Sequence, residues 1–135
     1  MTGIGVMLRQ LAGREGSAEA LEASIGKTID NVNIYEDELT VRMKDGSAVR
    51  FKDEGQSCCE HRYMRTDDDL HEFEGSAFIG AEVVDAPDVE DAGEVHEVQF
   101  LRIHTSEGVI TVSNHNEHNG YYGGFSIEAR VIPAP

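Results

Sequence analysis

Two short segments of this 135-residue sequence hold most of the side chains that could bind a metal ion or act as a nucleophile. The first, EGQSCCEHRYM, contains both cysteines of the chain, Cys58 and Cys59, followed by His61. The second, SNHNEHNGYYGGF, contains His115 and His118, three residues apart. Thiolate and imidazole groups are ligands that suit zinc. We therefore expect a zinc site where the two segments meet.

Adjacent side chains on extended backbone point to opposite sides, so only one of the two cysteines can face such a site. The expected ligands are three histidines and one cysteine: His61, His115, His118 and either Cys58 or Cys59. Three further side chains of the second segment are expected at the rim: Glu117, Tyr121 and Tyr122. Zinc is the one cofactor that the sequence suggests.

Other interpretations of the same residues stay open. A cysteine paired with His115, and oriented by Asn116 or Glu117, has the residue types of a cysteine-nucleophile hydrolase. The surrounding acidic residues argue against it, because they raise the pKa of a thiol. Buried free cysteines and a glycine-rich turn would explain the same segments without any function. Whether the protein is an enzyme is therefore left open.

The chain is strongly acidic, with a formal net charge of −15. Residues 1–52 carry seven Lys or Arg and eight Asp or Glu, whereas residues 53–128 carry three and eighteen. Such a field repels nucleic acid and attracts cations or basic proteins. An alternative function is thus an interaction protein that binds basic partners, although simple solubility is the better explanation of the charge.

No apolar run is long enough to span a membrane, and the first residues lack the pattern of a secretory signal. We therefore expect a cytoplasmic protein with no membrane partner. Adjacent cysteines also argue against a structural disulfide framework. The sequence predicts no particular oligomeric state.

Alternating apolar residues predict strands over 27–35, 77–86 and 123–132, with irregularities near Asn31 and Gly80. Two hairpins are expected, one turning at Asp45-Gly46 and one at residues 106–108. Thr66 is expected to cap a short helix, and residues 4–25 read as helical. The metal-binding segments are expected to be loops, 55–65 and 113–124.

The expected fold class is α+β, with a mostly antiparallel sheet of six or seven hairpin-linked strands, an N-terminal helix and one short inner helix. Residues 1–25 are expected to be a helical extension, and residues 26–135 a single domain.

Four segments together resemble a known family: FKDEGQSCCEHRYMRTDDDL, IGAEVVDAP, EVHEVQFLRIHTSEG and HNEHNGYYGGF. The chain resembles a family of small uncharacterised domains encoded largely by tailed phages and bacteria. The resemblance spans roughly residues 25–130, and its most specific parts are CCEH at 58–61 and HNEHNGYYGG at 115–124. It implies a phage or prophage setting, and hence the host cytoplasm, without assigning an activity. In that setting the acidic chain is an alternative candidate for an interaction protein that binds or inhibits a basic host factor.

Overall fold

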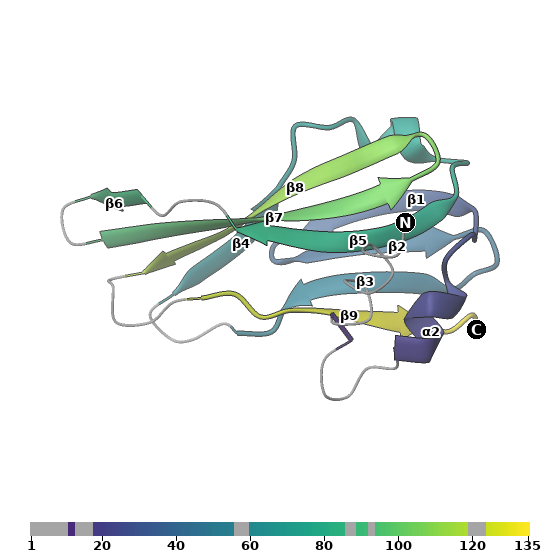
Figure 1. Cartoon of the computed structure of the whole chain (residues 1–135), viewed down its shortest axis with the longest axis horizontal. Coiled ribbons are helices and arrows are strands. Elements are labelled where there is room, and N and C mark those ends of the chain that lie inside the picture. The colour runs from purple at the N-terminus through teal and green to yellow at the C-terminus, as the bar shows by residue number, and fades with distance from the viewer. Residues whose placement is uncertain (1–10, 13–17, 56–59, 86–88, 92–93, 119–123) are drawn as a thin grey trace.

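The computed structural model describes residues 11–12, 18–55, 60–85, 89–91, 94–118 and 124–135, and these residues form two antiparallel β-sheets (Figure 1). The first sheet has the strand order β1-β2-β3-β9, with β1 at Ile29–Tyr35, β2 at Glu38–Met43, β3 at Ala48–Asp53 and β9 at Ile127–Ile132. Every neighbouring pair in it is antiparallel.

The predicted Asp-Gly hairpin is confirmed as the connection between β2 and β3. Gly46 adopts a positive φ of 92°, which a residue without a Cβ reaches at little cost. The Asp45 carboxylate accepts hydrogen bonds from the backbone N–H of Ser47 at 2.8 Å and from its hydroxyl at 2.6 Å. The turn is thereby fixed, and Val41 pairs with Val49 in the strands that follow it.

The second sheet has the strand order β4-β8-β7-β5, with a further short strand, β6, pairing with β7. Its strands are β4 at His61–Arg65, β5 at Phe78–Asp85, β6 at Val89–Asp91, β7 at Glu94–Thr105 and β8 at Gly108–His118. β7 and β8 are the predicted second hairpin, and the predicted irregularities at Asn31 and Gly80 are present as register shifts.

The described helical elements are short. The α-helix α2 spans Ala18–Ala23, and the 3-10 helix η1 spans Leu70–Phe73. Asp69, rather than the predicted Thr66, caps η1 by accepting a hydrogen bond from the N–H of His71. Thr66 instead donates to the carbonyl of Thr111, because the chain is still extended beside β8 at that point.

The core lies between the two sheets. Alternate residues of each strand point inward, and the largest of these side chains are completely buried. They include Leu39, Val41 and Phe51 from the first sheet and Leu101, Ile103 and Ile110 from the second. Leu21 of α2 belongs to the same cluster, so this part of the expected N-terminal extension packs on the body of the domain.

The expected antiparallel character is confirmed, but the number of strands is larger than six or seven. β4 and the distal part of β8 occupy residues that were expected to be loops, since most of their inward residues are polar and hide the alternation: Arg62 of β4, and Asn114, Asn116 and His118 of β8. None of the helices among the described residues has the length and apolarity needed to cross a lipid bilayer.

Candidate functional site

The two segments singled out in the sequence lie side by side as paired strands. β4 pairs with β8, which places His61 opposite Glu117 and Tyr63 opposite His115. β8 also pairs with β7, which places His96 opposite Glu117 on its other side. Opposite residues share one face of a sheet. We call this outward-facing group the histidine face: His61, Tyr63, His96, His115 and Glu117.

The closest contact on the histidine face joins two imidazole rings. Nε2 of His96 lies 2.7 Å from Nδ1 of His115, and the ring centroids are 4.9 Å apart. The other nitrogen of His115, Nε2, lies 2.8 Å from the hydroxyl oxygen of Ser113. Both nitrogens of the His115 ring are thus engaged by side chains on the same face.

The Ser113 hydroxyl determines which nitrogen of His115 carries the proton. This hydroxyl donates its single hydrogen to the backbone carbonyl of Arg65, at 3.2 Å, because a carbonyl can only accept. Ser113 Oγ must then accept from Nε2–H of His115. Nδ1 of His115 is left with a lone pair, and Nε2–H of His96 donates to it. A single hydrogen therefore lies between the two facing nitrogens.

Tyr63 holds the His115 ring from the opposite side. The two rings stack with centroids 4.7 Å apart and planes 6° from parallel, while the Arg65 guanidinium lies 5.0 Å from the Tyr63 ring centroid. Burial, and then a hydrogen bond to the Glu117 carboxylate, raise the pKa of Tyr63, so that its hydroxyl stays protonated. The orientation of His115 is therefore fixed by Tyr63, Ser113 and His96 together.

Electrostatics keep His115 neutral. Burial makes the largest contribution to lowering the pKa of its imidazole, followed by the electrostatic effects of His96 and Arg65, while the Glu117 carboxylate opposes them. A neutral imidazole retains the Nδ1 lone pair near neutral pH. His71 of η1 behaves in the opposite way, since a hydrogen bond to Glu74 at 2.8 Å raises its pKa.

In metal-free buffer we expect His115 to titrate at a lower pH than His71. Between the lowered pKa of folded His115 and the ordinary histidine value of about 6.5, the unfolded chain binds more protons than the folded chain. The contribution of His115 to stability is therefore complete above that window and falls as the pH drops through it. NMR titration of the ring protons, assigned with His115→Asn and His71→Asn, measures the order, and the reverse order would contradict this electrostatic picture.

The inner face of the same strands carries a different group. Asp53, Glu60, Arg62, Asn114 and Asn116 form a buried polar cluster, in which Arg62 donates to Asp53 at 2.7 Å and to Glu60 at 2.8 Å. Asn114 donates to Asp53 at 3.1 Å, and Asn116 donates to Glu60 at 2.7 Å. The cluster joins the end of β3 to β4 and β8, and it thereby fixes the backbone beneath the histidine face.

His118 lies on this inner side, where its Nε2 is 2.6 Å from the Glu97 carboxylate. Residues three apart on a strand point to opposite faces, so His115 and His118 are not brought together. His61 and His115 do share a face. Cys58, Cys59, Tyr121 and Tyr122 lie outside the described residues, so the predicted cysteine ligand, two of the rim residues and the cysteine-nucleophile interpretation stay predictions.

Within the described part of the chain, no three or more His, Cys, Asp or Glu side chains are grouped so that they could hold a metal ion as they stand. The close pair of His96 and His115 was not predicted, and neither was the hydrogen bond between His115 and the Ser113 hydroxyl. Strand periodicity combined with the hairpin at residues 106–108 would have found the pair, because that turn sets the β7–β8 register.

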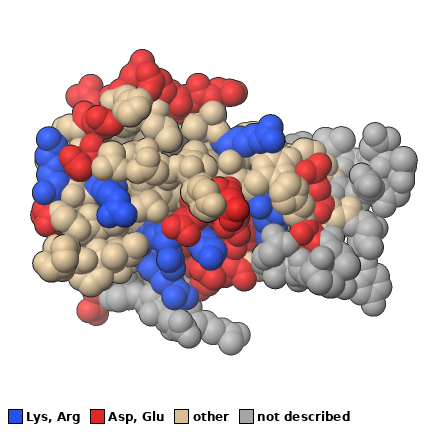
Figure 2. Space-filling model, turned by 180° about the vertical axis from the view of Figure 1, so that it is seen from behind, with Lys and Arg blue, Asp and Glu red and all other residues tan. Residues whose placement is uncertain are grey.

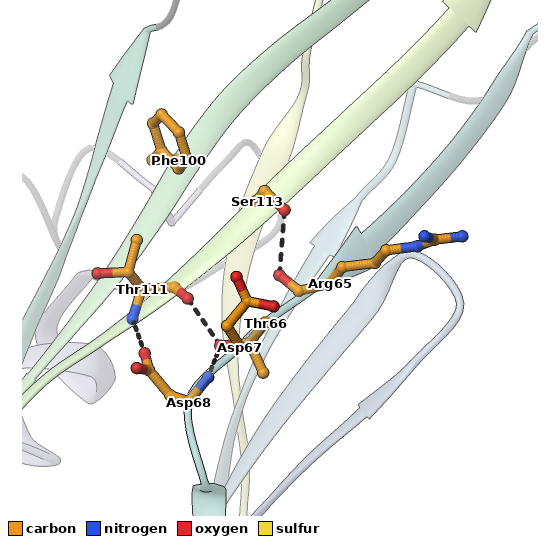
Figure 3. Close-up of a pocket in the computed structure, with 7 residues that line it drawn as sticks. All are labelled: Arg65, Thr66, Asp67, Asp68, Phe100, Thr111 and Ser113. Atoms are coloured by element: carbon orange, nitrogen blue, oxygen red, sulfur yellow. Dashed lines mark hydrogen bonds between the residues drawn. The ribbon is translucent and has the colours of Figure 1, made fainter.

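A surface pocket of about 240 Å³ adjoins the histidine face (Figure 3). It is lined by Arg65, Thr66, Asp67, Asp68, Phe100, Thr111 and Ser113. Its rim is tied together by the bond from the Thr111 N–H to the Asp68 carboxylate, at 2.8 Å, and by the Ser113–Arg65 bond. These bonds hold the segment that follows β4 against β8, and the bond to Arg65 leaves the Ser113 hydroxyl oxygen free to accept from His115.

Comparison with known proteins gives a family without an assigned activity. The model of the family described as Domain of unknown function (DUF7448) matches residues 22–127, from α2 to the first residue of β9. No curated protein and no solved structure matches the chain. The expected membership of an uncharacterised family is confirmed, and the phage setting remains a prediction. Because the match covers far more than half of the sequence, the chain belongs to the DUF7448 family.

Proposed function

We propose that this domain binds a divalent transition metal of the zinc class on the histidine face. The ligands are Nδ1 of His115, Nε2 of His96 and the carboxylate of Glu117, with His61 as a fourth. The observation that carries the proposal is the 2.7 Å approach of the two imidazole nitrogens. A metal ion would replace the one hydrogen between them, and each nitrogen would then present a lone pair to it.

The arrangement on the strands favours such a site. His115 and Glu117 are two residues apart on β8, and His61 and His96 lie opposite Glu117 on the two neighbouring strands. Side chains on the same or on neighbouring strands placed in this way have Cβ atoms about 4.5–7 Å apart, and His61 and His96, with β8 between them, are about 10 Å apart. These spacings allow the four side chains to reach from both sides toward one ion above Glu117, at about 2.0–2.2 Å from each ligand atom. Imidazole and carboxylate groups are both common zinc ligands.

The ligand set needs one rearrangement. Glu117 at present forms a hydrogen bond with Tyr63, and its carboxylate lies 3.7 Å from Nδ1 of His61. The Glu117 side chain is 49% exposed and that of His61 73% exposed, so both can turn about their side-chain bonds without disturbing the core. His96 and His115 would shift apart slightly to admit the ion. His96 and His115 are thus oriented before the ion binds, and the side chains of Glu117 and His61 turn to complete the ligand set.

Ser113 supports the site as an outer partner. A histidine that binds zinc through one nitrogen usually donates a hydrogen bond from the other, which fixes its tautomer and its ring orientation. His115 donates from Nε2 to Ser113, whose hydroxyl is itself held by the Arg65 carbonyl. The nitrogen presented to the metal is therefore the one that this hydrogen-bonded chain leaves free.

The test is a zinc titration of untagged protein, stripped with a chelator, by calorimetry or by competition with a chromogenic chelator. We expect one ion per chain, and at least roughly 100-fold weaker binding in the double variant His96→Ala/His115→Ala. His71→Ala is the matched control, since His71 is an exposed histidine of η1, away from this face, and its loss should leave zinc affinity unchanged. Equal affinity in the double variant and the wild type would refute the proposal.

A second comparison separates this site from the one predicted with a cysteine ligand. The variant Cys58→Ser/Cys59→Ser should retain zinc binding if the four ligands all lie on the histidine face. Loss of binding in that variant, together with binding that survives in His96→Ala, would instead favour a cysteine-containing set. Binding of Co²⁺ gives an independent readout, because thiolate ligands add strong charge-transfer absorption that imidazole and carboxylate ligands do not.

A further inference from the structure

A groove of about 520 Å³ lies between β1, an edge strand of the first sheet, and the segment from β4 to η1. We call it the β1 groove. On one side of it along β1, the N–H of Met64 donates to the carbonyl of Glu36 at 2.7 Å. On the other side, Ile29 exchanges hydrogen bonds with Gly75 and Ser76, each at 2.8 Å. The stretch of β1 between these two connections borders the groove.

This stretch of β1 turns backbone hydrogen-bonding groups toward the groove. The Glu36 carbonyl points away from β2, because it accepts from Met64 of β4. Residues of a strand alternate in direction, so Ile34 and Val32, two and four residues earlier, also point their N–H and C=O groups away from β2. Within the described parts of the chain, these four groups form no hydrogen bond.

An edge of this kind is a template for a further strand, which would supply the missing donors and acceptors. Every strand pair in both sheets is antiparallel, so we expect the same of an added strand. The floor of the groove is apolar, with Val32 and Met64 in the core and the half-buried Ile34 and Leu70 packed against it. Because side chains of a strand alternate, every second side chain of an added strand would face this floor.

The wall formed by η1 and the residues before it is acidic. One exposed cation, Arg65, and five exposed acidic residues lie there: Asp67, Asp68, Asp69, Glu72 and Glu74. Figure 2 shows red Asp and Glu atoms gathered along the top of its face, the edge of the molecule at which the teal η1 segment lies in Figure 1. With a net charge of −15 on the chain, this rim attracts a positively charged segment and repels an acidic one.

We propose that the β1 groove binds an extended basic peptide segment of another protein, which adds to β1 as an antiparallel strand. The open backbone groups of Val32 and Ile34 select an extended backbone. The apolar floor selects an apolar side chain at every second position, and the acidic wall selects Lys or Arg at the positions between them. The partner segment therefore has alternating apolar and basic residues.

The probe is the hexapeptide Lys-Val-Lys-Val-Lys-Val, titrated into isotope-labelled protein and followed by NMR. A chelator in the buffer keeps any metal on the histidine face out of the measurement. We expect saturable binding that shifts the amide signals of Val32 and Ile34 and slows their hydrogen exchange. Affinity should fall at least about fivefold between about 0.05 M and 0.5 M salt, and the acidic hexapeptide Glu-Val-Glu-Val-Glu-Val should not bind.

Two methylated forms of the probe test the backbone pairing on the wild-type protein. In an antiparallel pair, the probe residues opposite Val32 and Ile34 direct their side chains to the same face, so they are the valines. Methylation of the valine nitrogens removes the N–H groups that pair with β1 and should weaken binding at least about tenfold. Methylation of the lysine nitrogens is the matched control, with the same composition and charge, and should preserve binding.

Variants of the protein test the same contacts from the other side. Ile34→Pro removes one N–H that faces the groove, which an edge strand tolerates, and should weaken binding about three- to tenfold. Ile34→Ala keeps that N–H and should weaken binding less. Asp67→Lys should weaken binding about two- to fivefold, whereas Glu19→Lys makes the same charge change on α2, beside β9 at the other edge of the sheet, and should not. Circular dichroism establishes that each variant is folded.

The proposal fails if the basic hexapeptide does not bind, or if its binding leaves the Val32 and Ile34 amides unchanged. Equal binding of the two methylated probes would show that backbone pairing plays no part, and this comparison stands even if Ile34→Pro does not fold. Binding of the acidic hexapeptide as tight as that of the basic one would overturn the choice of a basic partner. Protection of the two amides without any peptide, in protein that sediments as a dimer, would assign the groove to a second copy of this chain instead.

Discussion

Replacing Arg62 with methionine is expected to lower the free energy of unfolding by about 3–5 kcal/mol, since it leaves uncompensated charge in the interior. The Arg62 side chain is 3% exposed, and its two carboxylate partners, Asp53 and Glu60, are 0% and 1% exposed. Methionine fills most of the volume of the arginine stem but donates no hydrogen bond. The loss of stability therefore arises mainly from the two carboxylates, which stay buried without a positively charged partner. Chemical denaturation followed by circular dichroism measures it.

The matched control is Arg65→Met, on the same strand but pointing outward. Arg65 is exposed and lies over the Tyr63 ring, so its removal should cost less than about 1 kcal/mol. If Arg62→Met does not fold, the triple variant Arg62→Met/Asp53→Asn/Glu60→Gln should fold, because it removes the charges as well as their partner. Equal effects of Arg62→Met and Arg65→Met would show that the buried polar cluster does not hold the two sheets together.

Replacing Gly55 with alanine is expected to destabilise the fold by about 1–3 kcal/mol through overpacking against the same arginine. A Cβ atom at position 55 would lie 2.7 Å from Nη1 of Arg62 and 3.0 Å from its Cζ. A free arginine could move aside at small cost, but this guanidinium is held by Asp53 and Glu60 in a buried site. The space that the glycine leaves is thus part of the arginine's binding pocket.

A double-mutant cycle checks this explanation. In Gly55→Ala/Arg62→Met the flexible methionine can yield to the new methyl group, so the combined loss should be smaller than the sum of the two single losses by at least about 0.5 kcal/mol. The free energies are measured by denaturant unfolding under the same conditions as the single variants. Additive losses would mean that the cost of Gly55→Ala arises elsewhere, for example in its hydrogen bond to Asp53.

Sequence reasoning predicted the parts of the fold in which apolar residues alternate. The strands on either side of Asp45-Gly46 and the hairpin at residues 106–108 were recognised because their inward residues are Leu, Val, Ile or Phe. β4 was missed because its inward residues are Arg62 and Met64. A strand whose buried side is charged has no apolar periodicity, and only the partner that neutralises the charge, here Asp53, makes such a strand possible.

The same limit of reasoning from sequence patterns applies to the candidate site. The His-x-x-His spacing of His115 and His118 was interpreted as one pair of ligands, which is correct for a helix or a loop. On a strand the same spacing separates the two rings, and β8 continues to His118 because the side-chain N–H groups of Asn114 and Asn116 donate to buried carboxylates. His96 could be joined to His115 only after the register of β7 and β8 was known, and that register comes from the turn at residues 106–108 and not from the spacing of the histidines.

The buried polar cluster also determines which alignment of the strands is the native one. An alternating apolar pattern repeats every two residues, so it excludes a slip by one residue but tolerates a slip by two. A two-residue slip of β8 would move Asn114 and Asn116 by about 7 Å, so that one asparagine takes the place of the other and one of the two carboxylates, Asp53 or Glu60, loses its asparagine donor. Those hydrogen bonds therefore distinguish alignments that hydrophobic burial leaves equivalent. Through them, residues on the buried side of the sheet select the alignment of β8 with β4 that places His115 beside Tyr63 on the exposed side.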